Sequence, residues 1–594
     1  MPNVNTNLEE ELPGKPKDYR KVIRGLLRYL SKEWLIFTVV FGLVILSNLM
    51  LLWGPRFSGN AIDALGIGMG TVAFELVVRN AVLMLLCYVG SAAATYIMTL
   101  LGVRASQKII REMRQDTFDK IVELPLAYID SHQAGDLVSR ISYDLDVVNQ
   151  SLTHDIVQIA AGTFMVAGSL YMMLSLSPAL SAIFLLMVPV TVLFTSYRVK
   201  KTRPLFSRRS KKLGQMNGYV EEILSGQKTI RAYDKETFFS GEFDDINATS
   251  IDAYYKADYQ SAFNGPSVMF ISNLSLALVS LFGALLFLQG GFTLGGLSAF
   301  ILYSRRFSGP INEVANLVAE LQSAASAAER VFTLLEQPSE PADKADAVTL
   351  TEVRGEVEFR DVSFSYIPDV PVIKGMNLTA KPGSLTAIVG PTGASKTTII
   401  NLLMRFYDPQ EGEILIDGHS TLDVSRQSLR RSFAMVLQDS WLFNGSIREN
   451  IAYGRPEAKL EDIRRAAQAA HIDEFIDAQP EGFDTQISDG AGNLSQGQKQ
   501  LLTIARAMLL DTPMLILDEA TSNVDSRTEI AIQDAMNRLI EGRTSFVIAH
   551  RLSTIQNADH ILLVADGQIK EQGTHDDLLS RGGAYAKLYQ SQFS

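Results

Sequence analysis

The sequence contains only one cysteine, Cys87, in 594 residues. A single cysteine excludes an internal disulfide framework and any metal site built from several cysteines. Basic residues are also scarce relative to acidic ones, because 54 Lys and Arg against 65 Asp and Glu give a net charge of −11. This balance argues against a protein whose main task is to bind nucleic acid. The first 20 residues are polar and contain no apolar stretch, so we expect no cleavable signal peptide there.

The composition indicates a mixture of two kinds of domain. Hydrophobic residues make up 47% and charged residues 20%, and the mean hydropathy is +0.11. A soluble enzyme usually carries more charge and a pure membrane channel less, so we expect one strongly apolar part and one ordinary soluble part. At about 150 residues per domain, the length also favours two or more structural units.

Apolar runs of membrane-spanning length occur only in the first half of the chain. Five runs lack Asp, Glu, Lys and Arg and approach the ~20 residues that a bilayer core requires: Trp34–Trp53, Asn80–Val103, Ile156–Leu176, Ala179–Tyr197 and Pro266–Gln289. A sixth run begins at Gly291 but reaches Arg305 and Arg306 after 14 residues. We count it as a span, because five spans would place the second half of the chain opposite the N-terminus. The predicted transmembrane domain covers 18–335, after an N-terminal tail at 1–17, with spans at about 34–53, 80–103, 156–176, 179–197, 266–289 and 291–315.

The distribution of basic residues predicts the orientation of these spans. Lys and Arg cluster before the first span and in the links 104–155 and 198–265, whereas the other links have few or none. This positive-inside pattern places both termini in the cytoplasm. The two long links have helical periodicity, so we expect membrane helices that extend into the cytosol and turn near Pro125 and Tyr233. A separately folded insert is the alternative. Residues 18–30 form a basic amphipathic pattern, which predicts a helix lying in the membrane interface.

The second half of the chain has the pattern of an α/β domain. A Pro/Ala/Asp-rich linker at 336–353 is followed, over 354–594, by strand-like segments that alternate with helical ones. The predicted fold is therefore a membrane all-α six-helix domain with long cytoplasmic helix extensions, followed by an α/β P-loop nucleotide-binding domain.

A phosphate-binding loop follows the strand that ends at Val389. Its residues are Gly390, Pro391, Thr392, Gly393, Ala394, Ser395, Lys396 and Thr397, and Thr398 continues into a helix. Backbone N–H groups and the helix dipole can hold ATP phosphates there, Lys396 can reach the β- and γ-phosphate oxygens, and the Thr397 hydroxyl can bind Mg²⁺. The usual pattern has Gly where this chain has Ser395. We expect Ser395 to weaken ATP binding or turnover, because the glycine keeps a Cβ out of a tight backbone curve.

A pair of carboxylates ends a second buried strand about 120 residues later. Asp518 follows Met514–Leu517 and is suited to hold Mg²⁺ through water, and Glu519 is suited to polarise the attacking water.

Further segments resemble one family, the ATP-binding cassette (ABC) proteins. Leu494–Gln498 (LSQGQ) resembles the family's signature motif, Gln438 the Q-loop glutamine and His550 the switch histidine. Tyr366 resembles the aromatic residue that stacks on adenine, and the segment ending at Asp525 resembles the D-loop. The resemblance implies catalytic roles for Glu519, His550 and Gln438, and metal contacts for Thr397, Gln438 and Asp518. Together with six spans, it implies a half-transporter of the exporter branch in a bacterial cytoplasmic membrane.

Family membership also implies a dimer that sandwiches two ATP molecules. Each would lie between the 390–397 loop of one subunit and a partner's signature, which in this chain is Ser495, Gln496, Gly497 and Gln498. Gln496 replaces a signature glycine and Ser488-Asp489 replaces the usual Gly-Glu, whereas Glu519 and His550 are intact. This combination resembles the catalytically competent subunit of heterodimeric multidrug-type exporters. A homodimer, and an ATP-gated channel or regulator on the same fold, remain alternatives.

The expected substrate is lipophilic or amphiphilic, multidrug or lipid-like, and membrane lipid is the expected surrounding partner. Arg305 and Arg306 follow the short sixth run, so two readings are open. Either one of them faces the translocation cavity, which would disfavour cationic substrates, or both anchor the cytoplasmic end of the span.

Overall fold

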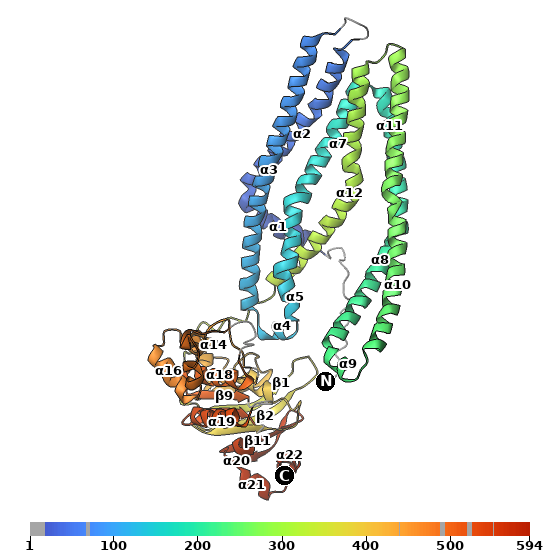
Figure 1. The fold of residues 1–594 in the computed structure, drawn as a ribbon. Coiled ribbons are helices and arrows are strands. Elements are labelled where there is room, and N and C mark those ends of the chain that lie inside the picture. Colours follow the sequence, from blue (N-terminus) through green and yellow to red (C-terminus); the bar gives the residue numbers. More distant parts are fainter. Residues whose placement is uncertain are drawn as a thin grey trace. The chain divides into compact units, whose positions relative to one another are not determined.

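The chain folds into two compact units. The structure, a computed structural model, describes residues 18–66, 72–438, 440–487, 494–518, 525–549 and 552–593. One unit comprises Met1–Glu123 and Gln133–Gln337, and the other comprises Leu124–His132 and Pro338–Ser594. Figure 1 shows that the first is helical and that the second contains the strands. The predicted N-terminal tail, 1–17, lies outside the described residues.

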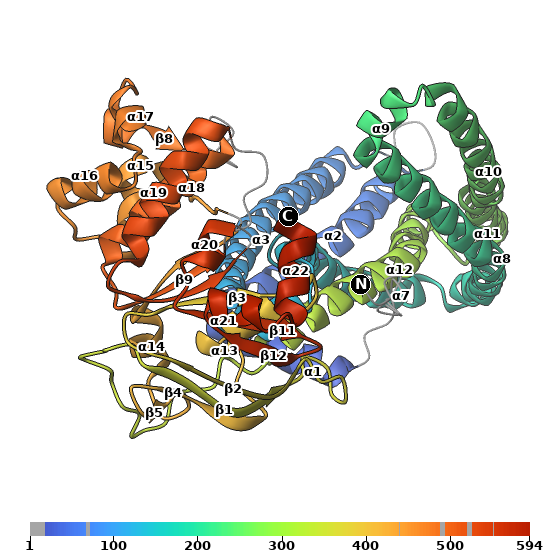
Figure 2. The same cartoon turned by 90° about the horizontal axis from the view of Figure 1, so that it is seen from below.

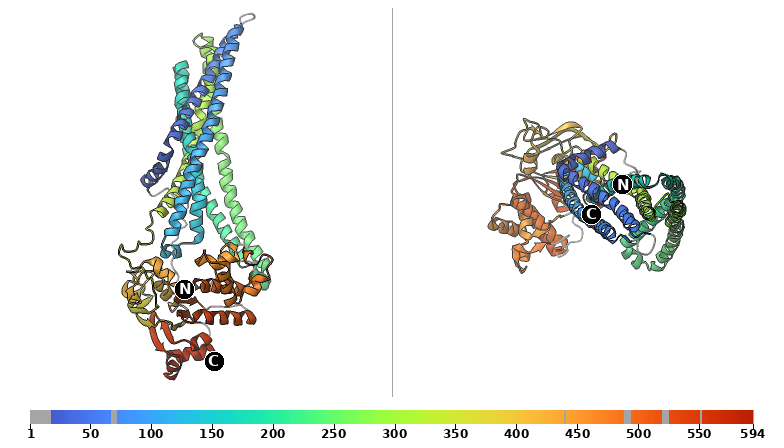
Figure 3. Two further views of the ribbon diagram at one scale, coloured as in Figure 1. Left: turned by 90° about the vertical axis from the view of Figure 1, so that its left-hand side faces the viewer. Right: turned by 90° about the horizontal axis from the view of Figure 1, so that it is seen from above.

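The first unit is built from long helices joined by short connections. Its elements are α1 (Tyr19–Leu30), η1 (Ser31–Glu33), α2 (Trp34–Asp63), α3 (Phe74–Glu123), α5 (Ala134–Ser139), η2 (Arg140–Asp144), α6 (Leu145–Gln150), η3 (Ser151–Asp155), α7 (Ile156–Leu176), α8 (Pro178–Ser225), α9 (Gln227–Ala232), α10 (Glu236–Ala262), α11 (Asn264–Leu288) and α12 (Leu294–Leu335). Figure 3 shows the longest of them running side by side.

The helix lengths agree with the predicted extensions beyond the membrane. Helix α3 has 50 residues and at 1.5 Å per residue is about 75 Å long, more than twice a ~30 Å hydrocarbon core. Helices α8 and α10 meet through the short α9, and Asp234 has a left-handed backbone at the turn. The 104–155 and 198–265 links are therefore continuations of the long helices rather than a separately folded insert.

Five helical segments are long and apolar enough to cross a membrane. They are Tyr19–Asp63, Phe74–Glu123, Ala134–Leu176, Pro178–Ser225 and Glu236–Leu288. The first four each contain one uncharged run, and the fifth contains all of its run except Gln289. Helix α12 has 42 residues, which is sufficient length, but Arg305 and Arg306 interrupt its apolar part. The sixth span therefore stays a prediction based on topology.

Helices α2 and α12 pack so closely that their backbones are in direct contact. A Cβ atom added to Gly59 would lie 2.5 Å from the Gly295 carbonyl oxygen, so the contact requires glycine. Asp63, at the end of α2, accepts hydrogen bonds from the Gly295 N–H (2.7 Å) and the Thr293 hydroxyl (2.9 Å) at the start of α12. The end of one helix thus caps the beginning of the other.

Pro55 interrupts the hydrogen bonding of α2, and Arg306 of α12 supplies a replacement donor. Proline has no N–H, so the Leu51 carbonyl loses its helical partner. The Arg306 guanidinium donates to that carbonyl, and the buried Tyr303 hydroxyl donates to the next one, of Leu52, at 2.6 Å. Arg306 also lies 5.9 Å from the ring centroid of Tyr88 on α3. Arg306 is therefore held by protein groups, whereas Arg305 is exposed.

The second unit contains a six-stranded and a four-stranded sheet. The strand order of the larger sheet is β12 (Gln568–Gly573), β11 (His560–Ala565), β3 (Leu385–Val389), β10 (Thr544–Ile548), β9 (Met514–Asp518) and β6 (Phe433–Val436). All its pairs are parallel except β11–β12. The smaller, antiparallel sheet is β2 (Ile373–Ala380), β1 (Val357–Phe364), β4 (Glu411–Ile416) and β5 (His419–Ser420), and β7 (Gly445–Ser446) pairs with β8 (Gln486–Ile487).

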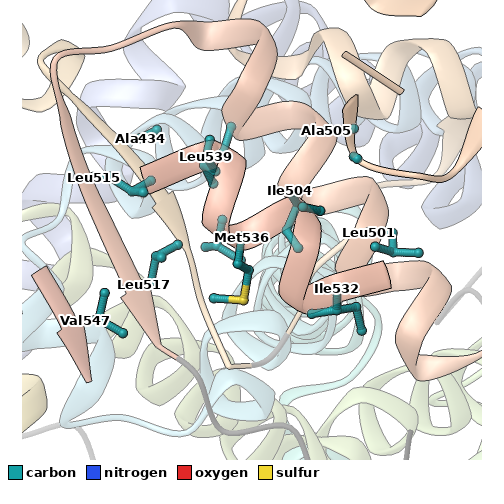
Figure 4. Packing of buried hydrophobic residues seen from close by; sticks show 14 of the residues in the cluster. Ala434, Leu501, Ile504, Ala505, Leu515, Leu517, Ile532, Met536, Leu539 and Val547 are labelled. Atoms are coloured by element: carbon teal, nitrogen blue, oxygen red, sulfur yellow. The ribbon is translucent and has the colours of Figure 1, made fainter. Parts of the chain in front are cut away.

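Helices cover the parallel sheet and close its core. They are α13 (Lys396–Leu403), α14 (Arg426–Arg431), α15 (Ile447–Ile451), η4 (Ala452–Gly454), α16 (Leu460–Ala469), α17 (Asp473–Asp477), η5 (Gly482–Asp484), α18 (Gln496–Leu510), α19 (Ser526–Ile540), α20 (Leu552–Gln556), α21 (His575–Ser580) and α22 (Ala584–Phe593). In Figure 2 the four-stranded sheet (olive) and the helices α15–α19 (orange) lie on opposite sides of this unit. Side chains of α18 and α19 pack on Leu515, Leu517 and Val547 (Figure 4). Strands β3 and β10 are fully buried, which explains their continuous apolar sequences.

The segment predicted as a linker is fixed to the second unit. Arg430 forms hydrogen bonds to both carboxylate oxygens of Glu340 (3.1 and 2.5 Å), and Arg426 pairs with Asp343 at 3.0 Å. Val348 forms an isolated parallel bridge with Val424. The turn predicted near Pro125 begins α4 (Leu126–Asp130), whose Asp130 accepts a hydrogen bond from the Tyr407 hydroxyl at 2.7 Å.

Candidate functional site

The predicted ATP-binding residues gather at one edge of the six-stranded sheet. Strands β3, β10, β9 and β6 are parallel neighbours, so their carboxyl ends share that edge. The 390–397 loop follows β3, Asp518 ends β9, and Gln438 comes two residues after the end of β6. Asp518 is opposite Ile548, which is opposite Ile388. At ~4.8 Å per strand, the carboxylate's backbone is about 10 Å from the strand that carries the loop. This is the usual ligand edge of an open α/β sheet.

The loop has the tight curvature that the sequence predicts. Gly390, with φ of +157°, leaves no room for a side chain, because an added Cβ would overlap the Val564 carbonyl oxygen. Gly393 has φ of +82°. Ser395 has φ of +72° and ψ of 24°, a left-handed conformation that glycine adopts without strain and serine does not. The departure from the usual motif thus falls on a backbone position that favours glycine.

Lys396 lies across the loop. Its Nζ donates to the carbonyl oxygens of Gly390 (2.8 Å) and Pro391 (3.2 Å). Burial lowers the pKa of Lys396, and the nearby Asp518 acts in the opposite direction. The ammonium group is thus partly desolvated and held by two neutral acceptors. Phosphate oxygens, which are charged, are better partners for it than these carbonyls.

Tyr366 is positioned beside the helix that follows the loop. Its hydroxyl donates to Thr398 Oγ1 at 3.2 Å and accepts from the Asn401 amide at 3.2 Å. The ring packs edge-on against Phe364 and Tyr407, and the side chain stays 44% exposed. A fixed, exposed aromatic ring next to a phosphate-binding loop can stack on a nucleotide base.

Some of the other predicted site residues lie in the described part of the chain, and the rest do not. Thr397 is exposed at the start of α13, and Thr398 is buried behind it. Gln438 is exposed beyond β6. Asp525 caps α19 by accepting the Thr528 N–H at 3.0 Å, a bond that lowers the pKa of its carboxyl. Glu519, His550 and the Ser488-Asp489 departure lie outside the described residues.

The signature residues begin helix α18. Ser495 accepts the Gln498 N–H at 3.2 Å, and the Gln498 side chain accepts the Ser495 N–H at 2.8 Å, which is a complete capping box. The S-x-x-Q spacing could have predicted this cap. Gln496 is exposed and Gly497 buried, so the residue that replaces a signature glycine takes no space from the core.

Arg506 is a positioning residue that the motifs do not reveal. Its guanidinium donates to the backbone oxygens of Asn450 (2.8 Å) and Trp441 (3.2 Å). It also lies over the rings of Phe443 and Tyr453, which stack on each other. Burial lowers its pKa. Arg506, from α18, thus fixes the segment that follows Gln438. Its partners are more than 50 residues away in sequence, so no local pattern predicts the contact.

Replacing Ser395 by glycine is expected to improve the site. The left-handed conformation costs a non-glycine residue on the order of 1–3 kcal/mol, and relief of part of it should lower the KM for ATP or raise turnover by up to tenfold. Steady-state ATPase titrations of wild type and Ser395→Gly test this. Gly393→Ser, at an open position that also has positive φ, is the matched control and should impair activity. Unchanged or reduced activity in Ser395→Gly would show that the loop accommodates serine without cost.

Comparisons with known proteins agree on the identity of both units. Residues 37–311 match the family model "ABC transporter transmembrane region", and residues 373–522 match "ABC transporter". The chain is 40% identical over 579 residues to the uncharacterized ABC transporter ATP-binding protein YfiC of Bacillus subtilis, covering 98% of this chain and 95% of that one.

Two further relatives carry names that mention lipids. The fatty acid ABC transporter ATP-binding/permease protein of Mycobacterium bovis is 44% identical over 518 residues, covering 87% of this chain and 82% of that one. The ATP-dependent lipid A-core flippase of Idiomarina loihiensis is 36% identical, covering 85% and 86%. Among solved structures, a bacterial Atm1-family ABC exporter with ATP bound superposes with a TM-score of 0.74 at 29% identity, covering 97% of this chain and 98% of that one.

Proposed function

The chain belongs to the ABC transporter family, as a half-transporter of exporter architecture, and from this premise we propose that it exports a lipophilic or amphiphilic substrate as one subunit of a dimer. It is an ATPase coupled to transport. The observation that supports the proposal is that the 390–397 loop, Asp518 and Gln438 follow or end strands at the same edge of the sheet, in one chain with helices long enough to span a membrane.

Each residue of the sheet edge has a proposed role in the ATPase cycle. The loop amides and Lys396 bind the phosphates, Tyr366 stacks on the adenine, and Glu519 polarises the water. Gln438 and His550 complete the γ-phosphate site. The hydroxyl, amide and carboxylate oxygens of Thr397, Gln438 and Asp518 fit the hard oxygen ligands that Mg²⁺ prefers. Mg²⁺ would neutralise charge that develops on the phosphates. Asp525 and Ser495–Gln498 serve the dimer interface.

The proposed partner is a different half-transporter chain. The support is sequence asymmetry, because Gln496 alters the signature whereas Glu519 and His550 are the residues of a competent hydrolytic site. Expression of the tagged chain alone, and together with the product of a neighbouring transporter gene, tests this proposal. ATPase activity that requires the second chain supports a heterodimer, whereas an active dimer of this chain alone supports the homodimer.

The transporter is proposed to lie in a bacterial cytoplasmic membrane with both termini and the second unit in the cytoplasm. Reconstitution into proteoliposomes tests the pump against the channel alternative on the same fold. ATP-dependent accumulation of an amphiphilic dye against a gradient supports the pump. Single-channel current with ATP, without dye accumulation, supports the channel.

Arg305 is proposed to favour acidic over cationic substrates. It is exposed on α12, forms no ion pair with any residue that the structure describes, and follows the apolar start of that helix. An unpaired arginine at membrane depth commonly faces a wet cavity. Arg305→Ala is therefore expected to raise the ratio of cationic to anionic dye transport at least twofold. Arg104→Ala, an exposed arginine of α3 just beyond the second uncharged run, is the control. An unchanged ratio at normal expression would leave Arg305 as an anchor.

A further inference from the structure

Helix α1 presents two exposed stripes that no part of the described chain covers. Tyr19, Ile23 and Leu27 recur every four residues and are 44%, 55% and 57% exposed. Arg20, Arg24 and Arg28 follow each of them by one residue and are also exposed. Residues four apart share a helix face and residues one apart differ by about 100°. The helix thus carries an apolar stripe with a row of three arginines beside it.

The connectivity of α1 places these stripes at the edge of the membrane. Only the three residues of η1 separate α1 from α2, and α2 begins at Trp34 with the first uncharged run. Trp34 is itself 60% exposed, and tryptophan is enriched at membrane interfaces. The basic flank is on the side that the positive-inside pattern assigns to the cytoplasm. The apolar stripe of α1 therefore lies at the depth of the boundary between headgroups and acyl chains, and the arginines lie at the depth of the headgroups.

Unlike the other basic residues of this helix and of η1, the three arginines form no ion pair with an acidic residue that the structure describes. Lys21 pairs with Glu336 at 2.7 Å, and Lys32 pairs with Glu112. Within the described ranges, none of Arg20, Arg24 and Arg28 forms an ion pair. Three exposed guanidinium groups in a row, beside an apolar stripe, are complementary to the phosphate groups of anionic lipids.

The opposite face of α1 is fastened to the last turns of α12. The Asp18 N–H donates to Glu329 at 2.9 Å, and Lys21 donates to Thr333 at 3.3 Å. Tyr29 stacks on Phe332 with ring centroids 6.3 Å apart, and a Cβ on Gly25 would lie 2.5 Å from the Phe332 ring. Helix α12 ends at Leu335, and the longer segment of the second unit begins at Pro338. In Figure 3 (left), α1 (dark blue) lies on the outside of the helical unit.

We propose that Arg20, Arg24 and Arg28 bind anionic lipid headgroups of the cytoplasmic leaflet and that this binding stimulates the ATPase through α12. The stimulation rests on the proposed transport function, whereas the binding does not. Lipid that holds α1 in the interface restrains the end of α12, the segment that leads into the ATP-binding unit. Anionic lipid is therefore a regulatory ligand of α1, separate from any transported substrate.

The binding step can be measured without any activity. The chain has three tryptophans, Trp34, Trp53 and Trp441, so Trp53→Phe with Trp441→Phe leaves Trp34 as the only tryptophan of this chain, which can be excited selectively over the tyrosines. In nanodiscs, brominated phosphatidylglycerol at 10 mol% is expected to quench Trp34 at least twofold more than brominated phosphatidylcholine at the same fraction. The triple variant Arg20→Gln/Arg24→Gln/Arg28→Gln should remove this preference, and the corresponding triple Lys variant should keep it. Equal quenching by the two lipids in the parent protein would overturn the binding proposal.

The regulatory step is measured as ATPase activity in nanodiscs of phosphatidylcholine with and without 30 mol% phosphatidylglycerol. We expect at least threefold stimulation in wild type and less than 1.5-fold in the triple Gln variant. The control Arg354→Gln/Arg431→Gln/Arg455→Gln removes the same charge from exposed positions of the second unit and should keep the stimulation. Equal stimulation of wild type and the α1 variant would overturn regulation through α1. Preferential quenching without any ATPase activity would instead contradict the proposed function.

Discussion

Glu519→Gln is expected to reduce steady-state ATP hydrolysis by at least a hundredfold in the assembled transporter and to leave ATP binding intact. A positioned general base contributes about 10²–10⁴-fold to the rate of a reaction, and glutamine keeps the shape of the side chain without its charge. In the sequence, Glu519 directly follows Asp518, the last residue of β9, and His550 comes two residues after the end of the neighbouring strand β10. Binding of a fluorescent ATP analogue and release of phosphate are the two measurements. Retained binding with lost release would assign the hydrolytic step to this residue.

A matched variant controls for the loss of one acidic group. Glu541→Gln makes the same change at an exposed position just after α19, and its activity should stay within twofold of wild type. If Glu519→Gln also stayed within twofold, the hydrolytic site of the dimer would have to lie on the partner chain.

Arg306→Met is expected to destabilise the helical unit, and Pro55→Ala is expected to rescue it. The methionine leaves the part-buried Leu51 carbonyl without the donor that Arg306 provides, and an unsatisfied carbonyl away from water costs about 1–3 kcal/mol. Alanine at position 55 restores a backbone N–H to α2, and this N–H can bond to the same carbonyl. We therefore expect Arg306→Met to lower the thermal unfolding midpoint by several degrees and the double variant to recover most of that loss.

The double-mutant cycle separates this explanation from a simple loss of packing. Arg305→Met changes the neighbouring exposed arginine, which makes no such bond, and should leave the midpoint within one or two degrees of wild type. If Pro55→Ala shifted the midpoint of wild type and of Arg306→Met equally, the two residues would be uncoupled. The explanation that Arg306 replaces the hydrogen bond that Pro55 removes from α2 would then be wrong.

Local patterns predicted the architecture, and they predicted the loop at the sheet edge that we propose as the ATP-binding site. The 390–397 loop is recognisable because it needs glycine, lysine and a hydroxyl at fixed spacing between a strand and a helix, and the structure places Ser395 in the left-handed conformation that this motif implies. The long helices that continue beyond the uncharged runs were predictable from apolar spacing across 104–155 and 198–265. These features depend on neighbours in sequence, so a single sequence contains them.

Contacts between distant residues were not predictable in the same way. The role of Arg306 depends on Pro55, about 250 residues earlier, and composition alone left a cavity residue and a membrane anchor as equal alternatives. The segment 336–353 has the composition of a free connector, yet Arg426 and Arg430 fix it through ion pairs with Asp343 and Glu340. Arg506 likewise acts on residues that only the fold brings near. Such pairings are chosen by tertiary packing, which local propensity does not encode.

The glycine contact between α2 and α12 gives this helix pair a mechanical property. At Gly59 and Gly295 the two backbones meet without intervening side chains, so no interdigitated knobs resist a change of crossing angle at that point. The hydrogen bonds of Asp63 lie on one side of the contact, and those of Tyr303 and Arg306 lie on the other. The contact can thus act as a hinge between α2 and α12, with hydrogen bonds that join the two helices on each side of it. A rotation of the helices about this contact would stretch the more distant hydrogen bonds most. The bonds to the Leu51 and Leu52 carbonyls would therefore break before the bonds of Asp63.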